Sequence, residues 1–442
     1  MNGNVSFVST NSITQGEQAG ILWTELFSRY HVKIHFGHRT FAWESEARGK
    51  AHVHVVIIGL AAFDTGNKRI YDYESGSEHA SVDAVKNISP YLVEGPDRAV
   101  SNRTKPLCDV PRMLWGNKPT DGGHLILSPE ECEELISAEP DAEAYIRPFM
   151  SGGDFLNNIK RYCLWLAGAD PAKLRDLPRV MERVEAVRKC RSESKAPSTQ
   201  AYAKFPTLFR QIAQPDSDYL AIPEVSSERR AYIPIAFVER RVICSNKIQF
   251  IPNATVYHFG VLSSATHMAW VRQVCGRLKS DYSYSNSLVY NNYPWPQSPM
   301  AKQKEAVKAA AQKVLDMRAQ FLAPVGQTSG LPVKGASGSQ SQNARARTGS
   351  APTPPEEALT GRPEVRPTKT ASLADLYDPL SMPPALVKAH AELDRAVDLC
   401  YRPQPFASER QRVEYLFGLY EQLTAPLLPA ARPKRPRKRL SA

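Results

Sequence analysis

Cysteine is scarce in this chain: only seven occur among 442 residues, and no two of them form a Cys-x-x-Cys pair. This scarcity argues against a disulfide-rich fold and against a cysteine-bound zinc site, so we expect reduced and mostly buried thiols in a cytoplasmic protein. Long apolar runs are also lacking, and the first ten residues contain no basic segment followed by an apolar one. The sequence therefore predicts neither a signal peptide nor a membrane span.

Metal-binding patterns are equally sparse. His31, His35 and His38 have a spacing close to that of metal ligands, but no nearby carboxylate or thiol completes the set. A strand and the loop after it would not bring the three imidazoles together, so we expect no metal site.

Positive charge is what the chain has in excess. The formal net charge is +11, of which residues 432–439 supply six charges and leave +5 for the remainder. A basic balance is compatible with a polyanionic partner such as double-stranded DNA. We expect residues 427–442 to form a basic disordered tail, which either adds nonspecific attraction to DNA or only solubilises the chain.

The first 75 residues predict part of an α/β fold. Apolar residues recur at helical spacing from Ala19 to Tyr30, after a Thr14-x-x-Glu17 pattern that is typical of a capping box. Residues 51–60 are almost continuously apolar, as in a strand of a sheet that is covered on both faces. The predicted elements are a strand at 5–8, a helix at 19–30, and strands at 32–36 and 51–60. Nothing before residue 5 completes a doubly wound sheet, so we expect the chain to begin inside this fold.

The rest of the chain changes character twice. Residues 76–300 combine short strands, turns rich in Pro and Gly, and a few helices, which predicts a mixed α/β domain. Within it, apolar spacing predicts one helix over 155–166 and another around Val180, Val184 and Val187. Helical spacing returns in 301–323 and 371–426, which predicts a helical carboxy-terminal domain.

Residues 324–370 separate these two helical segments. They are dense in Gly, Ser, Pro and Thr and contain almost no large apolar side chains, so we expect a disordered linker. The predicted fold class is therefore α+β with several domains.

Four stretches together resemble the MmeI-like (Type IIL) family of combined restriction and modification enzymes. They are 9–18 (STNSITQGEQ), 38–44 (HRTFAWE) with the strand after it, 275–296 (CGRLKSDYSYS to YNNYPWP), and 372–395 (SLADLYDP with the later AH and LDR). The four matches occur in the family's order and span nearly the whole chain apart from the linker and the tail.

The resemblance implies an identity for each domain. Residues 1–75 are similar to the carboxy-terminal portion of a class I DNA methyltransferase domain, which makes the predicted first sheet a partial one. Residues 76–300 resemble a target-recognition domain, and 301–323 with 371–426 resemble the family's helical carboxy-terminal domain. The expected function is then sequence-specific DNA recognition within an adenine-N6 DNA methyltransferase.

Several motifs of such an enzyme are missing from this sequence. Methylation of adenine requires the base to leave the duplex and enter a pocket. In the family resembled, an Asn-Pro-Pro-aromatic motif holds the adenine amino group, and a Gly-rich strand-to-helix turn holds S-adenosylmethionine. Neither motif occurs here, nor does a nuclease cluster of carboxylates and lysine. We therefore expect that this chain alone binds no cofactor and that S-adenosylmethionine serves the complete enzyme.

One aromatic residue matches the ring on which the flipped base stacks in the family resembled. That residue is Phe41, which the sequence pattern places in the loop between the 32–36 and 51–60 strands. Stacking of this kind contributes about 1–3 kcal/mol per base. The alternative is that Phe41 and Trp43 simply cover the end of the sheet.

Lys279 and Asp281 follow the strongest of the four matches, and the resemblance places base choice at these two positions. A lysine can donate to guanine O6 and N7, and an aspartate can accept from cytosine N4. In an extended strand, residues two apart face the same side, so both could reach one base pair. We predict that Lys279 and Asp281 read one G·C pair; the alternative is a solvated charge pair.

Further candidates are less specific. Polar residues that flank apolar strands are candidates for base reading, with strand-end capping as the alternative: Glu224, Asn246 and Lys247. Arginines near these strands are candidates for phosphate contacts, which position a protein on DNA without specifying sequence; they are Arg229, Arg230, Arg240, Arg241 and Arg277. Local ion pairs are the alternative for the arginines.

Three hypotheses for the whole chain stay open at this stage. The first is a specificity half that acts with a separate chain carrying the missing methyltransferase motifs. The second is a stand-alone DNA-binding remnant of a disrupted restriction–modification gene. The third is an enzyme that is active alone, which the incomplete sheet argues against.

Overall fold

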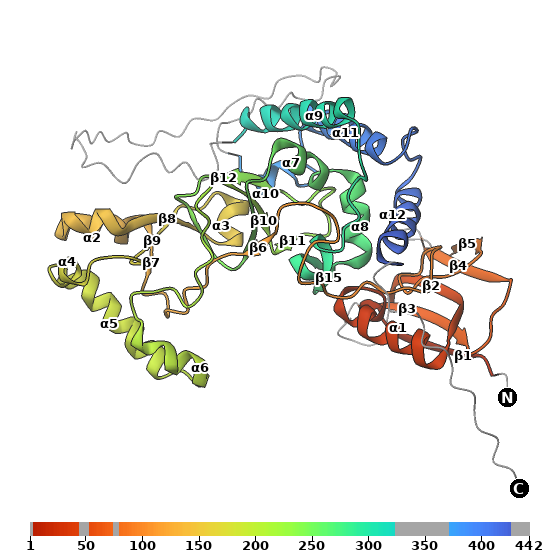
Figure 1. The fold of residues 1–442 in the computed structure, drawn as a ribbon, viewed down its shortest axis with the longest axis horizontal. Coiled ribbons are helices and arrows are strands. Elements are labelled where there is room, and N and C mark those ends of the chain that lie inside the picture. Colours follow the sequence, from red (N-terminus) through yellow and green to blue (C-terminus); the bar gives the residue numbers. More distant parts are fainter. Residues whose placement is uncertain (1–2, 44–52, 74–78, 323–370, 426–442) are drawn as a thin grey trace, which may run out of the picture.

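The computed structural model describes residues 3–43, 53–73, 79–322 and 371–425. Figure 1 shows a sheet with one helix at one end of the molecule, a mixed central region under a layer of helices, and a lobe that projects at the other end. The expected α+β fold with several domains is confirmed. The predicted linker at 324–370 and the predicted tail at 427–442 lie outside the described residues.

The first sheet has five strands in the order β1-β3-β2-β4-β5. Its elements are β1 (Val5–Thr10), α1 (Gly16–Tyr30), β2 (Lys33–Trp43), β3 (Val53–Ala61), β4 (Lys68–Tyr73) and β5 (Ala80–Val85). The three strands and the helix predicted here are confirmed. β4 pairs in parallel with β2, and β5 pairs antiparallel with β4, so the sheet continues ten residues past position 75.

The predicted capping box at the start of α1 is wrong. Residues Asn11–Thr14 form a 3-10 helix, in which the Thr14 hydroxyl donates to the carbonyl of Asn11 over 2.9 Å. Gln15 is the N-cap residue of α1, and its side chain makes no capping bond. The Thr14 hydroxyl is therefore bonded within the 3-10 helix and does not cap α1.

The central region holds two small sheets. One has the order β12-β10-β14-β6 and the other the order β11-β16-β15. Their strands are β6 (Leu114–Trp115), β10 (Tyr219–Pro223), β11 (Val225–Ser226), β12 (Ala236–Val238), β14 (Ile248–Pro252), β15 (Gly276–Leu278) and β16 (Asp281–Ser283). Helices α7 (Val256–Leu262) and α8 (Ala265–Val274), followed by the short π-helix η4 (Asn286–Tyr290), pack beside these sheets.

The projecting lobe has a hydrophobic core of its own, built mainly from residues between Leu125 and Phe209. Its sheet has the order β13-β8-β9-β7. The strands are β7 (Ile126–Leu127), β8 (Ile146–Met150), β9 (Arg161–Leu164) and β13 (Ile243–Cys244). The helices are α2 (Pro129–Ala138), η2 (Pro140–Tyr145), α4 (Pro171–Arg175), α5 (Pro178–Ser192), α6 (Pro197–Gln200) and η3 (Ala201–Lys204). Helix α3 (Gly152–Asn157) follows β8 and packs on the central core through Phe155.

One of the two helices predicted between residues 155 and 187 is confirmed and the other is wrong. Helix α5 contains Val180, Val184 and Val187, all buried. The helix expected over 155–166 ends at Asn157, because Asn158 takes the left-handed conformation with φ 53°. The chain then continues as strand β9, and its apolar residues face the lobe core from a strand.

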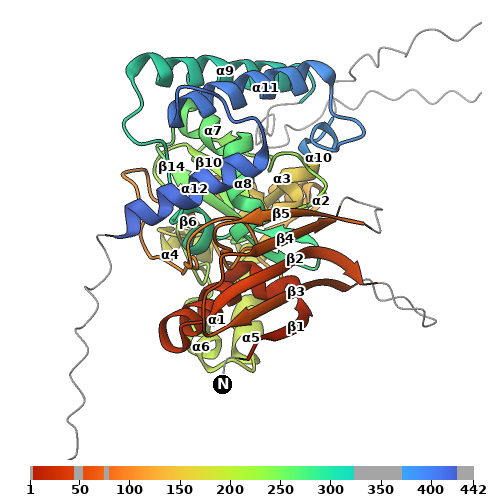
Figure 2. The same ribbon diagram turned by 90° about the vertical axis from the view of Figure 1, so that its right-hand side faces the viewer.

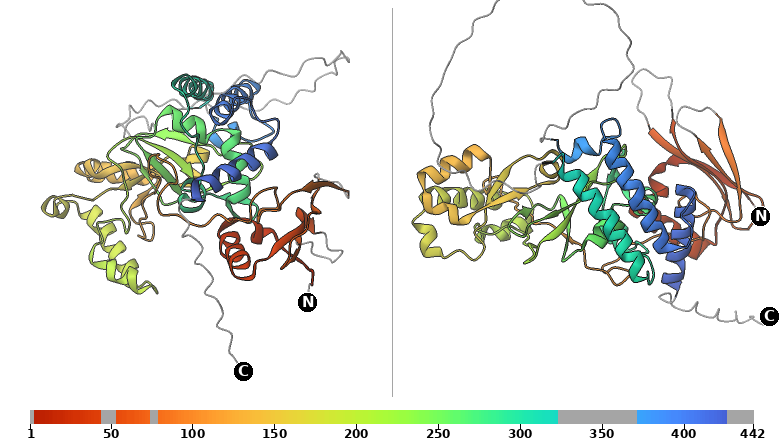
Figure 3. Two further views of the ribbon diagram at one scale, coloured as in Figure 1. Left: turned by 45° about the vertical axis from the view of Figure 1, so that its right-hand side comes forward. Right: turned by 90° about the horizontal axis from the view of Figure 1, so that it is seen from above.

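The carboxy-terminal helices cover the central region. They are α9 (Ala301–Ala319), α10 (Leu373–Leu376), α11 (Pro384–Tyr401) and α12 (Glu409–Thr424). Figures 2 and 3 show α9 and α11 side by side, where Lys313 pairs with Glu392 over 2.9 Å. α12 contacts α8 through Phe417 and Trp270, whose ring centroids are 5.3 Å apart. One continuous core thus runs from the first sheet to these helices.

The cysteines behave as the composition predicts: all seven are free, and five of them are buried. Within the described residues, no helix combines the length and apolar character that a membrane crossing requires.

Candidate nucleic-acid interface

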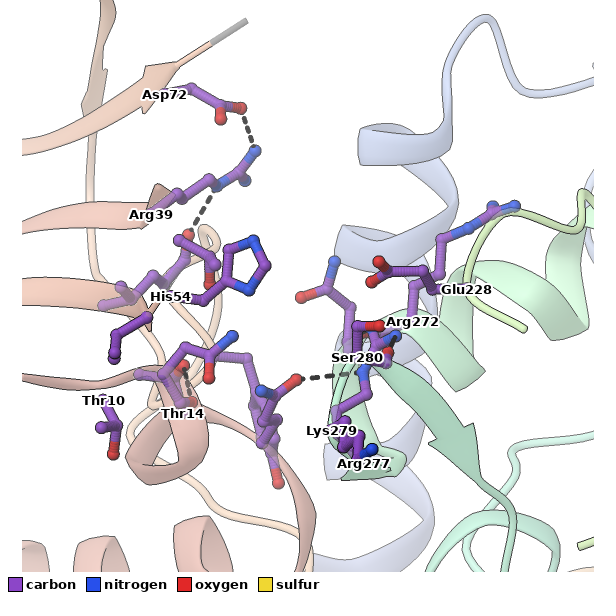
Figure 4. Close-up of a pocket in the computed structure, with 17 residues that line it drawn as sticks. Thr10, Thr14, Arg39, His54, Asp72, Glu228, Arg272, Arg277, Lys279 and Ser280 are labelled. Atoms are coloured by element: carbon purple, nitrogen blue, oxygen red, sulfur yellow. Dashed lines mark hydrogen bonds and ion pairs between the residues drawn. The ribbon is translucent and has the colours of Figure 1, made fainter. Parts of the chain in front are cut away.

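A cleft of about 720 Å³ lies between the first sheet and the β15–β16 hairpin. Figure 4 shows its two walls facing each other, with Thr10, Arg39 and His54 on one side and Glu228, Arg272 and Lys279 on the other. The Arg39 guanidinium pairs with the Asp72 carboxylate over 2.5 Å, and its Nε donates to the carbonyl of Leu92. The cleft therefore joins the methyltransferase-like sheet to the region in which base reading is predicted.

Lys279 occupies the tip of the hairpin that forms one wall. Leu278 pairs with Asp281, so Lys279 and Ser280 form a two-residue loop. Lys279 has φ 58°, a conformation that usually requires glycine in such loops. The expectation that Lys279 and Asp281 share one side of an extended strand is wrong, because the chain reverses between them. Both residues nevertheless lie at the same hairpin end.

Asp281 is held from the neighbouring strand. One of its carboxylate oxygens accepts from the backbone amide of Glu228 over 3.3 Å. The segment after β11 therefore lies against the hairpin end, and the carboxylate keeps its other oxygen for a further donor. Lys279 is exposed and faces the cleft.

The second group of base-reading candidates meets on the adjoining strands. The Lys247 ammonium lies 2.9 Å from the Glu224 carboxylate, and Asn246 stands beside Lys247 in the turn that leads into β14. The carbonyl of Glu224 accepts from the amide of Tyr284, the residue after β16. Three residues of extended chain, about 10 Å, therefore separate Asp281 from the Glu224 position.

The arginine candidates have different surroundings. Arg229 is 62% exposed and lies 4.0 Å from Asp378, while burial lowers the pKa of the half-buried Arg230. Arg241 pairs with Glu239 over 2.6 Å, and Arg240 donates to the carbonyl of Asp216. Arg277 is bonded to protein acceptors on three sides. Arg229 is thus largely open to solvent, and phosphate contact stays a prediction for all five arginines.

Phe41 lies within strand β2 and not in a loop, which corrects the predicted position. β2 extends to Trp43 because Phe41, Ala42 and Trp43 continue to pair with β3. The Phe41 ring packs against Tyr73, with centroids 4.9 Å apart. Thr40, and not Phe41, lines the cleft described above. Both the stacking role and the sheet-covering alternative stay open for Phe41.

The histidines of this region serve local contacts. His38 stacks on Tyr71, with ring centroids 4.3 Å apart, and its Nδ1 lies 2.7 Å from the Tyr73 hydroxyl. The Nε2 of His35 lies 2.8 Å from the carbonyl of Phe63. In the part of the chain that the structure describes, no three His, Cys, Asp or Glu side chains are grouped as metal ligands.

The described residues include no glycine-rich turn of the kind predicted to hold S-adenosylmethionine. In many α/β folds such a turn, between a strand and the helix that follows it, binds a nucleotide-like group. The connection from β1 to α1 is instead a 3-10 helix over Asn11–Thr14. Gly16, the glycine of this connection, is packed against Gly276 of the hairpin.

Comparisons with known proteins agree with this architecture. Three domain families match in order: the MmeI DNA-methyltransferase domain over residues 1–72, the MmeI target recognition domain over 94–297, and the MmeI C-terminal domain over 359–428. The chain belongs to the MmeI-like family of restriction–modification proteins. The resemblance inferred from the four sequence stretches is confirmed.

Two relatives show how much of their own length this chain spans. DNA methyltransferase A of Bacillus subtilis (strain 168) is 35% identical over 424 residues, which are 96% of this chain and 42% of that protein. The structure of the Type IIL restriction–modification enzyme MmeI in complex with DNA is 42% identical, with a TM-score of 0.77, over 96% of this chain and 50% of that one. The chain spans half or less of the relatives it matches.

Several cleft residues could not be found from the sequence. Gln15, His54 and Arg272 reach the cleft from three elements, and no local motif marks them. Trp115, on β6, was not predicted either, and its side chain is 48% exposed. The amide of the following residue, Gly116, donates to the carbonyl of Ile248, so Trp115 lies beside the turn that contains Asn246. Both its exposure and its place beside that turn depend on tertiary packing, which no local pattern encodes.

Proposed function

We propose that this chain reads a DNA sequence for an adenine-N6 methyltransferase of an MmeI-like restriction–modification system and does not methylate DNA by itself. The observation that carries the proposal is the cleft in which Lys279, on the β15–β16 hairpin of the target-recognition match, faces the sheet of the methyltransferase match. The MmeI relative was solved in complex with DNA, which supports a duplex as the ligand.

The hairpin end supplies the first set of base contacts. The Lys279 ammonium donates to guanine O6 and N7, and the free carboxylate oxygen of Asp281 accepts from cytosine N4. Because the chain reverses at Lys279, the two side chains approach the G·C pair from the two sides of a tight loop.

Glu224, Asn246 and Lys247 supply the second set. They lie about 10 Å along the strand from Asp281, which corresponds to about three base-pair steps of roughly 3.4 Å each. The two groups therefore read separate positions of one recognition sequence. Arg229 and Arg230, on the segment that holds Asp281, contact the phosphates beside the first position.

The catalytic half of the reaction is assigned to residues outside this sequence. Within the described residues β1 pairs with β3 alone, and Val5 and Val8 on this edge are 56% and 52% exposed. An exposed apolar strand edge is a surface for strand addition. We assign it to the part of the methyltransferase that binds S-adenosylmethionine, carried by a separate chain in the simplest arrangement, with Phe41 stacking on the flipped adenine.

Selection of bound sites from random duplex DNA tests the reading function. The wild-type chain should select a sequence with a G·C pair at one fixed position, and the double variant Lys279→Glu with Asp281→Arg should change the preference at that position only. An unaltered selected sequence would show that the hairpin end does not read bases.

A methyl-transfer assay tests whether recognition and methyl transfer belong to different polypeptides. With S-adenosylmethionine and the selected duplex, the purified chain should transfer no methyl group, and addition of a chain carrying an Asn-Pro-Pro-aromatic motif should restore transfer. Methylation of adenine by this chain alone would contradict the proposal that the chain does not methylate DNA by itself. Specific binding that no partner chain converts into methylation would favour the stand-alone DNA-binding remnant.

A further inference from the structure

Arg277 makes more contacts than any other charged residue of the recognition hairpin. Its Nη1 donates to the carbonyl of Ser280 over 3.2 Å, and its Nη2 donates to the carbonyl of Arg272 over 3.4 Å. The guanidinium also lies 4.1 Å from the ring centroid of Tyr282, the residue paired with it on β16. The side chain therefore ties the loop that carries Lys279 to the end of helix α8.

The remaining contact of Arg277 crosses to the start of helix α1, in the methyltransferase-like part of the chain. Its Nε lies 3.2 Å from the side-chain oxygen of Gln15, the N-cap residue of α1. Figure 4 shows this bond bridging the two walls of the cleft. One planar side chain thus holds the hairpin loop, helix α8 and helix α1 in a fixed relation, which the fork of donors on arginine allows and the single ammonium of lysine does not.

Backbone packing beside the bond between Gln15 and Arg277 leaves little room for the hairpin to move relative to helix α1. A Cβ atom on Gly16 would lie 3.1 Å from the Cα of Gly276, so the start of α1 and the start of β15 touch through their main chains. The hairpin consequently contacts the start of helix α1 at two points, the glycine contact and the bond between Gln15 and Arg277.

From these contacts we infer that Arg277 is a positioning residue for base recognition: it fixes the hairpin end against the start of helix α1, in the methyltransferase-like part of the chain, and does not hold a phosphate. The inference rests on the proposed function and adds to it a coupling between the reading element and the catalytic half. It replaces the phosphate contact predicted for Arg277 from the sequence.

The two roles of Arg277 predict different behaviour on DNA. A phosphate contact contributes equally to all sequences, and its loss reduces the salt dependence of binding by about one released ion. A positioning contact acts through Lys279 and Asp281, so its loss lowers the discrimination between the selected duplex and one with a changed G·C pair. The salt dependence then stays as in the wild type.

Arg277→Lys separates these roles, because lysine keeps the positive charge and loses the fork. We expect this variant to bind nonspecific duplex with the wild-type affinity and salt dependence, while its discrimination at the G·C position falls about tenfold, the effect of losing one base contact. Arg229→Ala is the matched control: its affinity should fall for all sequences, with a smaller salt dependence. The inference is overturned if Arg277→Lys discriminates at the G·C position as well as the wild type does. It is also overturned if Arg277→Gln binds all DNA sequences more weakly by the same factor and with a reduced salt dependence.

Amide hydrogen exchange in the free protein tests the same inference without DNA. Arg277→Lys and Gln15→Ala should each speed exchange of the hairpin amides at 276–283 by about tenfold, because the loop loses a fixed support. Arg240→Lys, a surface change away from the hairpin, should leave these amides unchanged. Unchanged hairpin exchange in both test variants overturns the positioning role. If the wild-type chain shows no sequence preference, the proposed function fails while this measurement still decides the inference.

Discussion

The ammonium group of Lys247 lies 2.9 Å from the carboxylate of Glu224, while the amide of Glu224 donates to the carbonyl of Lys247 over 3.0 Å. The backbone bond fixes the two positions relative to each other, and the Lys247 side chain is 60% exposed. The Glu224 side chain is less open, with 28% of its surface exposed, so the carboxylate stays in place while the ammonium is free to move. Because an ion pair that reaches the surface contributes only about 0–1 kcal/mol to stability, Lys247 can turn from Glu224 to a base edge at little cost.

Glu224→Gln tests this arrangement. Loss of the carboxylate should change the free energy of unfolding by less than about 1 kcal/mol, but lower discrimination at one base pair by about 1–3 kcal/mol. Urea unfolding and competition binding measure the two effects. Glu305→Gln is the control for loss of an ion-paired carboxylate, since Glu305 pairs with Lys308 on α9, away from the hairpin. Equal discrimination in Glu224→Gln and the wild type would remove Glu224 from the base-reading group.

Lys279→Gly separates function from stability at the hairpin tip. The positive φ of Lys279 strains a side-chain-bearing residue by about 1 kcal/mol, which glycine relieves while adding entropy to the unfolded chain. We expect thermal unfolding of the variant to be unchanged or slightly delayed, and the preference at the G·C position to be lost. A marked loss of stability would mean that the Lys279 side chain supports the fold.

Sequence reasoning succeeded where a regular element buries a periodic face. Apolar residues at a spacing of 3.6 predicted α1 and α5, and the continuous apolar run predicted β3. It failed where a single backbone conformation decides the outcome. Asn158 ends a helix whose apolar spacing continues past it, and Lys279 reverses the chain without the glycine that would announce a turn.

The site was predicted only in part for a related reason. The hairpin residues were found because a family motif surrounds them. The walls of the cleft come from distant segments: Gln15 and Arg277 are 262 residues apart in the chain and bonded in the fold. Such contacts depend on tertiary packing, which no local pattern encodes.

Gly16→Ala should disturb the contact between the hairpin and the start of helix α1. Gly16 has φ +67°, and an added Cβ would lie 3.1 Å from a backbone atom of Gly276, so either the helix start or the hairpin must shift. We expect about 1–3 kcal/mol of destabilisation together with weaker base discrimination. Gly276→Ala is the matched control, because its nearest neighbours would lie 3.9 Å away. Similar behaviour of the two variants would argue against a tight contact here.

Arg191→Met should unfold the projecting lobe. Arg191 is fully buried and donates to four backbone carbonyls, those of Pro119, Thr120, Phe205 and Leu208. A buried carbonyl without a partner costs about 1–3 kcal/mol, so the loss should exceed about 3 kcal/mol. Limited proteolysis should then cut within the lobe. Arg188→Met, at an exposed position of the same helix, should change stability by less than about 0.5 kcal/mol; an equally resistant Arg191→Met lobe would contradict the role assigned to this side chain.

His390 should make the protein sensitive to acid. Burial, together with the nearby Arg318 guanidinium, lowers the pKa of His390 to about 3, whereas in the unfolded chain it lies near the ordinary value of about 6.5. Between these values the unfolded chain binds a proton that the folded chain does not. The free energy of unfolding therefore falls as the pH falls below about 6.5, by about 1.4 kcal/mol per pH unit for this group.

His390→Gln isolates this contribution, because glutamine can still bond to the Tyr377 hydroxyl, 3.0 Å from the imidazole, and does not titrate. His267, whose pKa burial lowers to about 4, adds an acid sensitivity of the same sign, and Asp394, whose pKa burial raises to about 6, acts in the opposite direction. Both groups are present in the wild type and the variant, so the difference between their unfolding curves at about pH 5 and about pH 7 reports His390 alone. The variant should lose less stability on acidification than the wild type; parallel losses would show that His390 takes up its proton without unfolding.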